Sequence, residues 1–143
     1  MTVVILGDQF DEIVPEIQKA LDGALANTLD LQQTELNKQP PFDSGRMASS
    51  WRIGKNSPRF DADRGEDWES SAGVKWEYEG KITFDGDWYI SNNLPYSRPV
   101  ADLGSYPKSW GGKRVPSIPK DWFTSIANQT LNVFNKEYNK VKP

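Results

Sequence analysis

The sequence predicts an α+β domain in which a long N-terminal helix and a C-terminal helix cover one face of a small, mainly antiparallel sheet. Three patterns predict this class. Apolar residues recur every three or four positions near the start of the chain and again near its end, and apolar and charged residues alternate in the middle. The 143 residues suit a single domain spanning 1–143, with two long loops between its elements.

The first helix is expected over about residues 15–37. Pro15 fits a helix only in its first turn, so we expect a turn capped by Asp8 or Asp11 to precede the helix. The prolines of Gln39–Pro41 end it. The face expected to meet the core comprises Phe10, Ile13, Val14, Ile17, Leu21, Ala24, Leu25 and Thr28.

A short helix and a strand are expected next. Asp43 and Ser44 precede the segment Gly45–Trp51, which has the pattern of a short capped helix. Arg52–Gly54 is expected to lead into a strand. Residues 54–73 are rich in Gly, Asp, Ser, Arg and Pro and show no sustained periodicity. They are therefore expected to form a long exposed loop.

The middle of the chain is expected to be β. Apolar residues alternate with charged ones over Val74–Tyr78 and alternate again over Ile82–Phe84. Asp85-Gly86 is a strong hairpin signal, and Trp88–Ser91 supplies the returning strand. Asn92–Tyr96 is expected to end that strand in a turn.

A second loop and a final helix complete the expected fold. The loop covers residues 104–119, where exposed aromatic residues are mixed with Lys108, Lys113 and Arg114. One helix is expected to follow Pro119, and its tail of lysines suits the negative end of a helix dipole. Its apolar face is expected to comprise Trp122, Ile126, Thr130, Val133, Phe134 and Tyr138.

The composition excludes several classes of function. Seventeen basic against twenty acidic residues give a net charge of −3, which offers no basic face for wrapping nucleic acid. A binder of single-stranded nucleic acid, whose bases would stack on the aromatic residues, also lacks its expected basic groove. The chain has no Cys and no His, which excludes disulfides, thiolate or histidine metal sites and the common catalytic triads. Any catalysis would have to rest on carboxylates, Lys or Tyr, and we expect no enzyme, no metal and no cofactor.

The chain also lacks the features of a membrane or secreted protein. No stretch approaches the roughly 20 apolar residues that span a bilayer. The first seven residues have no basic region, and their apolar run is too short for a signal peptide. Synthesis in the cytoplasm and no contact with membranes are expected.

Two local patterns fail as binding motifs. The acidic cluster at 61–69 resembles a calcium loop, but with Asp61 at its first position Gly65 falls at the fifth and Ala72 at the twelfth. Gly111–Arg114 contains glycines and basic residues without the spacing of a phosphate-binding loop. A solvated loop and a basic loop tip that touches a partner are the better interpretations.

The aromatic residues leave one alternative function open. Asp85, Asp87 and either Glu77 or Glu79 offer a carboxylate pair beside Trp88 and Tyr89. Such a pair is what glycoside hydrolysis needs, and the rings would stack on sugar. A carbohydrate-binding module or a small carboxylate-based glycosidase is therefore the rival hypothesis. The same aromatic set is equally well explained as core or as protein–protein interface: Trp88, Tyr89, Tyr96, Tyr106 and Trp110.

A series of motifs gives a more specific hypothesis. Asp43–Met47, followed by Ser50-Trp51-Arg52, resembles the Asp-Thr-Gly-Arg-Leu…Ser-Trp signature of tailed-bacteriophage neck and tail-completion proteins. Trp88–Ser97 is similar to that family's second signature, Asn-Asn-x-Pro-Tyr-Ala. Asp102-Leu103-Gly104 resembles its acidic–apolar–Gly element, with Asp where Glu is usual, and Trp122 resembles its aromatic opening of the last helix. The order and spacing of these motifs agree with the family from about Phe42 to Phe134.

The resemblance implies a non-enzymatic structural subunit of the phage neck, of the head–tail connector or tail-terminator type. Such a subunit assembles with copies of itself into a ring, expected to be a hexamer, within the virion. The ring joins the portal or connector proteins to the tail tube or sheath. Double-stranded DNA passes through its channel without sequence-specific binding.

The resemblance also implies roles for individual residues. In the scaffold, Asp43 or Ser44 caps the short helix, Arg46 pairs with an acid such as Asp102, and the Asn92-Asn93 pair holds the strand end. The scaffold residues are Asp43, Ser44, Gly45, Arg46, Trp51, Asn92, Asn93, Pro95, Tyr96, Asp102 and Gly104. The two loops are expected to make the contacts between subunits or rings, through Arg59, Arg64, Trp68, Tyr106, Lys108, Trp110, Lys113 and Arg114.

Overall fold

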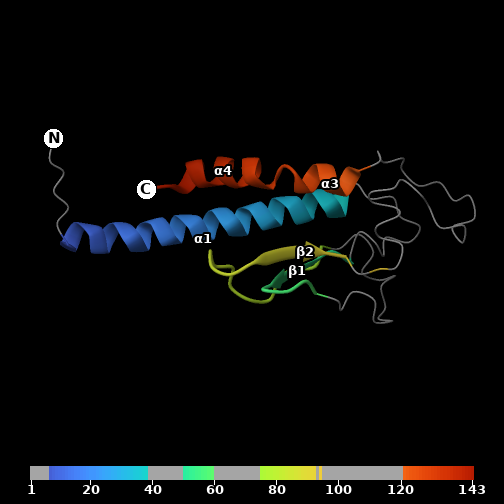
Figure 1. The fold of residues 1–143 in the computed structure, drawn as a ribbon, viewed down its shortest axis with the longest axis horizontal. Helices are drawn as coiled ribbons and strands as arrows, with labels where there is room; N and C mark the ends of the chain where they lie inside the picture. The colour runs from blue at the N-terminus through green and yellow to red at the C-terminus, as the bar shows by residue number, and fades with distance from the viewer. Residues whose placement is uncertain (1–6, 39–49, 60–74, 93, 95–120) are drawn as a thin grey trace, which may run out of the picture.

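The structure, a computed structural model, describes residues 7–38, 50–59, 75–92, 94 and 121–143 (Figure 1). These residues have an α+β fold, as predicted. The long helix α1 lies, in the view of Figure 1, between a small sheet and the helices α3 and α4, which run back along it. The elements are α1 (Gly7–Lys38), β1 (Arg52–Lys55), β2 (Trp88–Ser91), α3 (Trp122–Ala127) and α4 (Thr130–Val141).

Helix α1 begins earlier than predicted. It has 32 residues and starts at Gly7, so Pro15 lies in its interior and both Asp8 and Asp11 lie within the helix rather than before it. A proline inside a helix removes one hydrogen bond and costs about 3 kcal/mol. A long helix can bear this cost, because once nucleated it gains a hydrogen bond for each further residue. The end at Lys38, just before Gln39–Pro41, agrees with the prediction.

The predicted core-facing side of α1 is only partly buried. Ala24 and Thr28 are buried, whereas Val14 and Ile17, which belong to the same predicted face, are exposed. Along this face, burial therefore begins at Ala24, about three turns after Val14. The buried residues of α1 are Ala20, Ala24, Thr28, Leu29, Gln32, Gln33 and Leu36.

The single C-terminal helix that the sequence predicts is divided in two. Between α3 and α4, the Gln129 amide donates to the Ile126 carbonyl over 3.1 Å, which tightens the turn. The Gln32 side chain from α1 enters this break and donates to the Ile126 carbonyl at 3.2 Å and to the Thr130 hydroxyl at 2.7 Å. The prediction was wrong because an interaction between helices, which periodicity cannot show, stabilises the break.

The sheet consists, among the described residues, of two antiparallel strands. Arg52 pairs with Ser91 and Lys55 with Trp88, so β2 is confirmed and Arg52–Gly54 does lead into a strand. Two predictions were wrong. Lys55, which was expected in the loop 54–73, belongs to β1, and the antiparallel partner of β2 is β1 rather than Ile82–Phe84.

The strands predicted over Val74–Tyr78 and Ile82–Phe84 are absent from the described residues, in which 75–83 have no regular structure and Val74 is not included. Polar side chains of α1 hold the first of these segments. Gln33 donates to the Trp76 carbonyl at 2.6 Å, and Lys75 forms an ion pair with Asp30. Because the Trp76 carbonyl already accepts a hydrogen bond from α1, it does not require a partner in a neighbouring strand.

The core lies where the sheet meets the C-terminal part of α1 and the start of α3. It contains Leu36, Trp51, Leu94 and Trp122. The Trp51 ring stacks on Phe123 with centroids 5.2 Å apart and meets the edge of Trp122 at 6.5 Å. Trp51 is therefore a buried residue of the core, and its role in a family scaffold stays a prediction.

Candidate functional site

Two of the predicted scaffold residues, Trp51 and Asn92, lie in the described part of the chain. The Asn92 side-chain oxygen accepts a hydrogen bond from the Leu94 amide at 3.2 Å, which is the role expected of it at the end of β2. The remaining scaffold residues lie outside the described residues: Asp43, Ser44, Gly45, Arg46, Asn93, Pro95, Tyr96, Asp102 and Gly104.

Among the predicted interface residues, the structure describes only Arg59, which makes contacts within its own chain. Its guanidinium pairs with Glu79 at 2.8 Å and lies 4.6 Å from the ring centroid of Trp76. These contacts tie the segment after β1 to residues 75–79, so Arg59 has a clear structural role. The other predicted interface residues lie outside the described part: Arg64, Trp68, Tyr106, Lys108, Trp110, Lys113 and Arg114.

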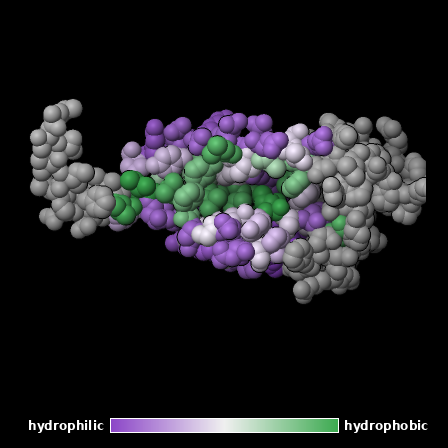
Figure 2. Space-filling model, in the orientation of Figure 1, coloured by the Kyte–Doolittle hydropathy of each residue, from purple (hydrophilic) through white to green (hydrophobic). Residues whose placement is uncertain are grey.

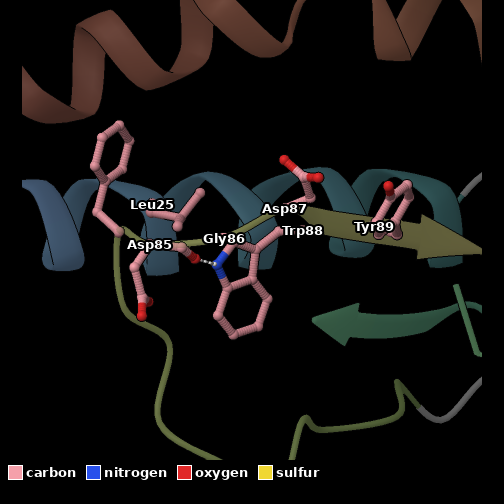
Figure 3. A pocket seen from close by; sticks show the side chains of 7 residues that line it. Leu25, Asp85, Gly86, Asp87, Trp88 and Tyr89 are labelled. Atoms are coloured by element: carbon pink, nitrogen blue, oxygen red, sulfur yellow. Dashed lines mark hydrogen bonds between the residues drawn. The ribbon is translucent and has the colours of Figure 1, made fainter. Parts of the chain in front are cut away.

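Two of the carboxylates proposed for the rival hypothesis, Asp85 and Asp87, line a pocket that we call the turn pocket, whereas Glu77 and Glu79 are not among its lining residues. Its volume is about 690 Å³, and it is lined by Leu25 and residues 84–89 (Figure 3). Asp85 and Asp87 are both present there, but their side chains point in opposite directions. They do not face a common point between them, as a general acid and a nucleophile would.

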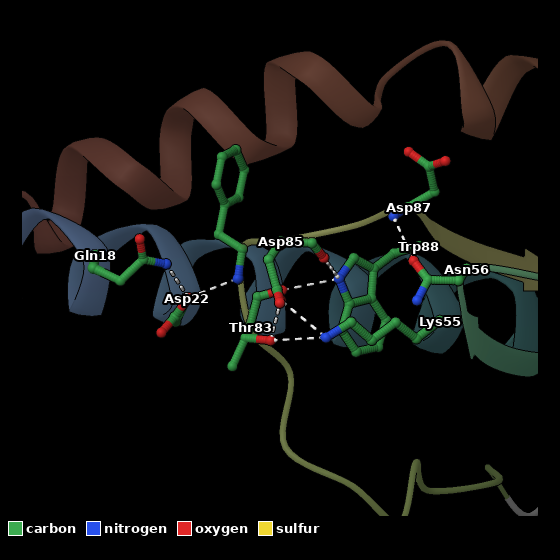
Figure 4. A network of polar contacts seen from close by, with 9 residues as sticks. Gln18, Asp22, Lys55, Asn56, Thr83, Asp85, Asp87 and Trp88 are labelled. Atoms are coloured by element: carbon green, nitrogen blue, oxygen red, sulfur yellow. Dashed lines mark hydrogen bonds and ion pairs between the residues drawn. The ribbon is translucent and has the colours of Figure 1, made fainter.

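Trp88 in the turn pocket is held in place by its neighbours (Figure 4). Its indole N–H donates to the carbonyls of Thr83 at 2.9 Å and Asp85 at 3.1 Å. The Lys55 ammonium lies 5.6 Å from its ring centroid, and Tyr78 meets it edge-on at 5.4 Å. A ring with these partners stabilises the turn and is poorly placed to stack on a sugar.

Asp85 is ionised in this arrangement. Hydrogen bonds from the Thr83 hydroxyl and from Lys55, whose nitrogen is 3.0 Å away, hold the pKa of its carboxyl below the ordinary value of 3.8. A general acid requires a raised pKa, so Asp85 has the wrong environment for that role. The turn is also fixed to α1, since the Phe84 amide donates to Asp22 at 2.6 Å (Figure 4). The turn pocket thus gives the rival hypothesis no support.

A second hollow, which we call the helix groove, was not predicted. It lies between α1 and the α3–α4 pair, has a volume of about 560 Å³ and is mainly apolar. Trp122 is buried in it, whereas Leu31 on α1 is 46% exposed. The lining residues are Leu31, Gln32, Glu35, Trp122, Ser125, Ile126, Gln129, Val133, Lys136 and Glu137.

The charged residues of the helix groove are of both signs. Glu35 comes from α1, and Lys136 and Glu137 come from α4. Glu137 is buried and accepts a hydrogen bond from Lys140 at 3.0 Å, one turn further along α4. The sequence did contain a signal for this groove, since Ile126 and Val133 were both assigned to an apolar face. The predicted face of α1 ended at Thr28, however, and did not include Leu31.

The surface of α1 is apolar well beyond the core. Figure 2 shows apolar side chains gathered along the middle of this face, with hydrophilic ones on either side, and further apolar side chains towards the N-terminal end of α1. Val14 is 45% exposed and Ile17 is 36% exposed. Neighbouring exposed apolar residues that extend an apolar patch make this end of α1 a candidate interaction site.

Within the described residues, no three His, Cys, Asp or Glu side chains are grouped closely enough to hold a metal ion. None of the helices in that part of the chain combines the length and the apolar character needed to cross a bilayer. No family model, curated protein or solved structure matches the chain.

Proposed function

We propose that this protein is a structural subunit of a bacteriophage neck, which assembles as a ring between the head connector and the tail. The observation that supports it is the way the family-like motifs meet in space. Trp51 directly precedes Arg52, which pairs with Ser91, and Asn92 follows Ser91 directly. Two motifs that are forty residues apart are therefore joined through the first pair of the sheet.

A residue of a further motif also packs against Trp51. Trp122, the aromatic residue that opens α3, meets the edge of Trp51 with ring centroids 6.5 Å apart. Leu94, two residues after Asn92, lies in the same buried cluster. Motifs that share one scaffold are expected to converge in this way, whereas chance matches would be scattered over the fold.

The described surface suits a subunit of a ring. Such a ring needs two different patches, each complementary to the other, on every copy. The exposed apolar end of α1 and the helix groove are the two patches that we assign to this contact. In this proposal the ring encloses double-stranded DNA, and the net charge of −3 favours passage of the DNA over binding to it.

The proposed function also implies a location in the virion, specific partners and no catalysis. The subunit is part of the virion, made in the host cytoplasm, and contacts the portal or connector on one side and the tail tube or sheath on the other. It is a structural protein without catalytic activity or cofactor. In the ring, the proposed hexamer, identical copies supply every lateral contact.

The test is quantitative mass spectrometry and electron microscopy of purified particles of the phage that encodes the chain. We expect a copy number equal to one ring per particle, and density for the fold at the head–tail junction. Absence of the chain from complete, infectious particles would contradict the proposal. Glycan arrays on the purified chain test the rival hypothesis separately, and we expect no specific binding.

A further inference from the structure

The exposed end of α1 continues the row of residues that forms its buried face. Residues on this row are spaced by three or four, so they lie on one side of the helix. In its middle Ala24 has an exposed fraction of 0% and Thr28 of 1%. The row repeats every seven residues, as in a helix that packs lengthwise on another helix: Val14, Ile17, Leu21, Ala24, Thr28 and Leu31.

Among the described residues, only the middle of this row is covered. α4 packs along α1, but the first turns of α1 extend past the end of α4 (Figure 1). Val14 and Ile17 are therefore exposed at one end of the row. At the other end Leu31 is exposed in the helix groove. The row is therefore exposed at both ends: Val14 and Ile17 project beyond α4, and Leu31 lies at the helix groove.

Helix α1 cannot join these two ends itself. Ile17 and Leu31 are fourteen residues apart, which is about 21 Å along a helix at 1.5 Å per residue. α1 is a continuous helix over this distance, so its projecting end cannot fold back into its own groove. A second copy of the chain can supply the missing partner.

We propose that the segment Val14–Leu21 of one copy packs into the helix groove of the next copy. Val14 and Ile17 then contact the apolar lining, which includes Trp122, Ile126 and Val133. This inference rests on the proposed function in one respect, that copies of the chain contact one another laterally. It adds which surfaces make that contact.

The charges of the two surfaces are complementary. The projecting segment has one acid and one base, Glu16 and Lys19. The helix groove offers Lys136 from α4 and Glu35 from α1. Lys136 is therefore a candidate partner for Glu16, and Glu35 is one for Lys19, while Glu137, the other acid of the groove, is already bonded to Lys140. Such a pattern selects orientation more than it adds affinity.

The contact is heterologous: each copy packs its projecting segment on one neighbour and receives the segment of another neighbour in its helix groove. Repetition of such a contact produces a closed ring when a whole number of these rotations from copy to copy adds up to one full turn. A symmetric contact between two projecting segments would instead stop at a dimer.

The oligomeric state of the full chain, measured by sedimentation velocity and native mass spectrometry, tests this contact. We expect the wild-type chain to self-associate with rising concentration, and both Ile17→Asp and Leu31→Asp to remain monomeric. The matched control is Leu131→Asp, since Leu131 is 67% exposed on α4 but does not line the groove. Its association is expected to equal that of the wild type. Circular dichroism checks that all three variants are folded.

Mixing the two deficient variants distinguishes a heterologous contact from a symmetric one. Ile17→Asp retains an intact groove and Leu31→Asp an intact projecting segment, so an equal mixture is expected to form a one-to-one heterodimer. Failure of the mixture to associate, or full association of either variant alone, would overturn the inference.

Cross-linking gives an independent readout, because the chain has no native cysteine. Glu16→Cys mixed with Lys136→Cys is expected to form a disulfide-linked heterodimer, whereas Glu16→Cys mixed with Leu131→Cys is not. Equal cross-linking of both pairs would overturn the proposed contact. A ring that is seen in particles but is unaffected by Ile17→Asp would overturn this inference and leave the proposed function intact. The inference would also be overturned if the wild-type chain neither associated nor formed the cross-link.

Discussion

The two halves of α1 have the same sequence pattern and opposite environments. From Ala20 onwards its apolar face packs against α4, the sheet and the aromatic core, and Leu36 near its end is 1% exposed. Val14 and Ile17 continue that face in the direction of the N-terminus but remain exposed. An amphipathic pattern therefore predicts that a helix face will be covered, but it does not say whether the cover belongs to the same chain.

The covered half is stabilised by contacts that are distant in sequence. Gln33 donates to the carbonyls of Trp51 and Trp76, and Gln32 donates to Ile126 and Thr130. The exposed half has only local polar contacts among its described residues, such as Gln18 to Asp22 at 2.9 Å. Substitutions in the two halves should accordingly differ in what they affect, with folding sensitive to one and association sensitive to the other.

The largest effect on stability is expected from Trp51→Ala. Trp51 is 4% exposed and contacts both Phe123 and Trp122, so its loss leaves a cavity between the sheet and α3. We expect the free energy of unfolding to fall by about 3–5 kcal/mol. Urea denaturation followed by circular dichroism measures this. A loss below 1 kcal/mol would show that the motif residue is not part of the core.

A matched pair of substitutions compares the two halves of α1 directly. Leu36→Ala in the covered half should lower the free energy of unfolding by about 2–5 kcal/mol. Ile17→Ala in the exposed half should change it by about 0.5 kcal/mol or less in the monomer. Thermal unfolding at low protein concentration is the measurement. Equal losses for the two variants would mean that the exposed segment is covered within the monomer.

A smaller effect is expected where a buried amide is removed. Gln33 is buried, and its side chain bonds to the Trp51 carbonyl at 3.2 Å and the Trp76 carbonyl at 2.6 Å. Gln33→Ala leaves these carbonyls without that donor and should cost about 1–3 kcal/mol. Gln18→Ala, on the exposed half of the helix, is the control, and its effect on the same urea denaturation curve should be negligible.

The smallest effect concerns the exposed turn that contacts α1 near its middle. The pKa of Asp85 is lowered by its hydrogen bonds to Thr83 and Lys55, so its contribution to stability is present above pH 4 and is lost as the pH falls through the lowered pKa. Asp85→Asn should therefore be slightly less stable than the wild type at neutral pH and equal to it in strong acid. A carboxyl titration by NMR with a midpoint at or above 3.8 would refute this.

Local patterns in the sequence predicted the elements that local interactions determine. The helical period located α1 and the final helical region, and the strand signal located β2. Trp51 as a core residue and Asn92 as the residue that holds the strand end were also predictable, because a large buried ring and an Asn at a strand end have roles that depend little on topology.

Interactions between distant segments account for what was missed. Val74–Tyr78 alternates like a strand, but in its described part Gln33 of α1 donates to the Trp76 carbonyl, and Lys75 donates to Thr34 of α1. The division between α3 and α4 depends on Gln32, which is 94 residues away from Ile126. The helix groove was missed for the same reason, since its lining comes from both ends of the chain.

Hydrogen exchange of the backbone amides, compared between the monomer and the assembled form, tests most directly whether a second copy covers the exposed half of α1. In the monomer we expect residues 14–19 to exchange quickly and residues 20–36 to be protected, because protection follows burial and packing. On assembly, protection should rise at residues 14–21 and along the helix groove at residues 122–133. Assembly without any gain of protection at residues 14–21 would contradict the account.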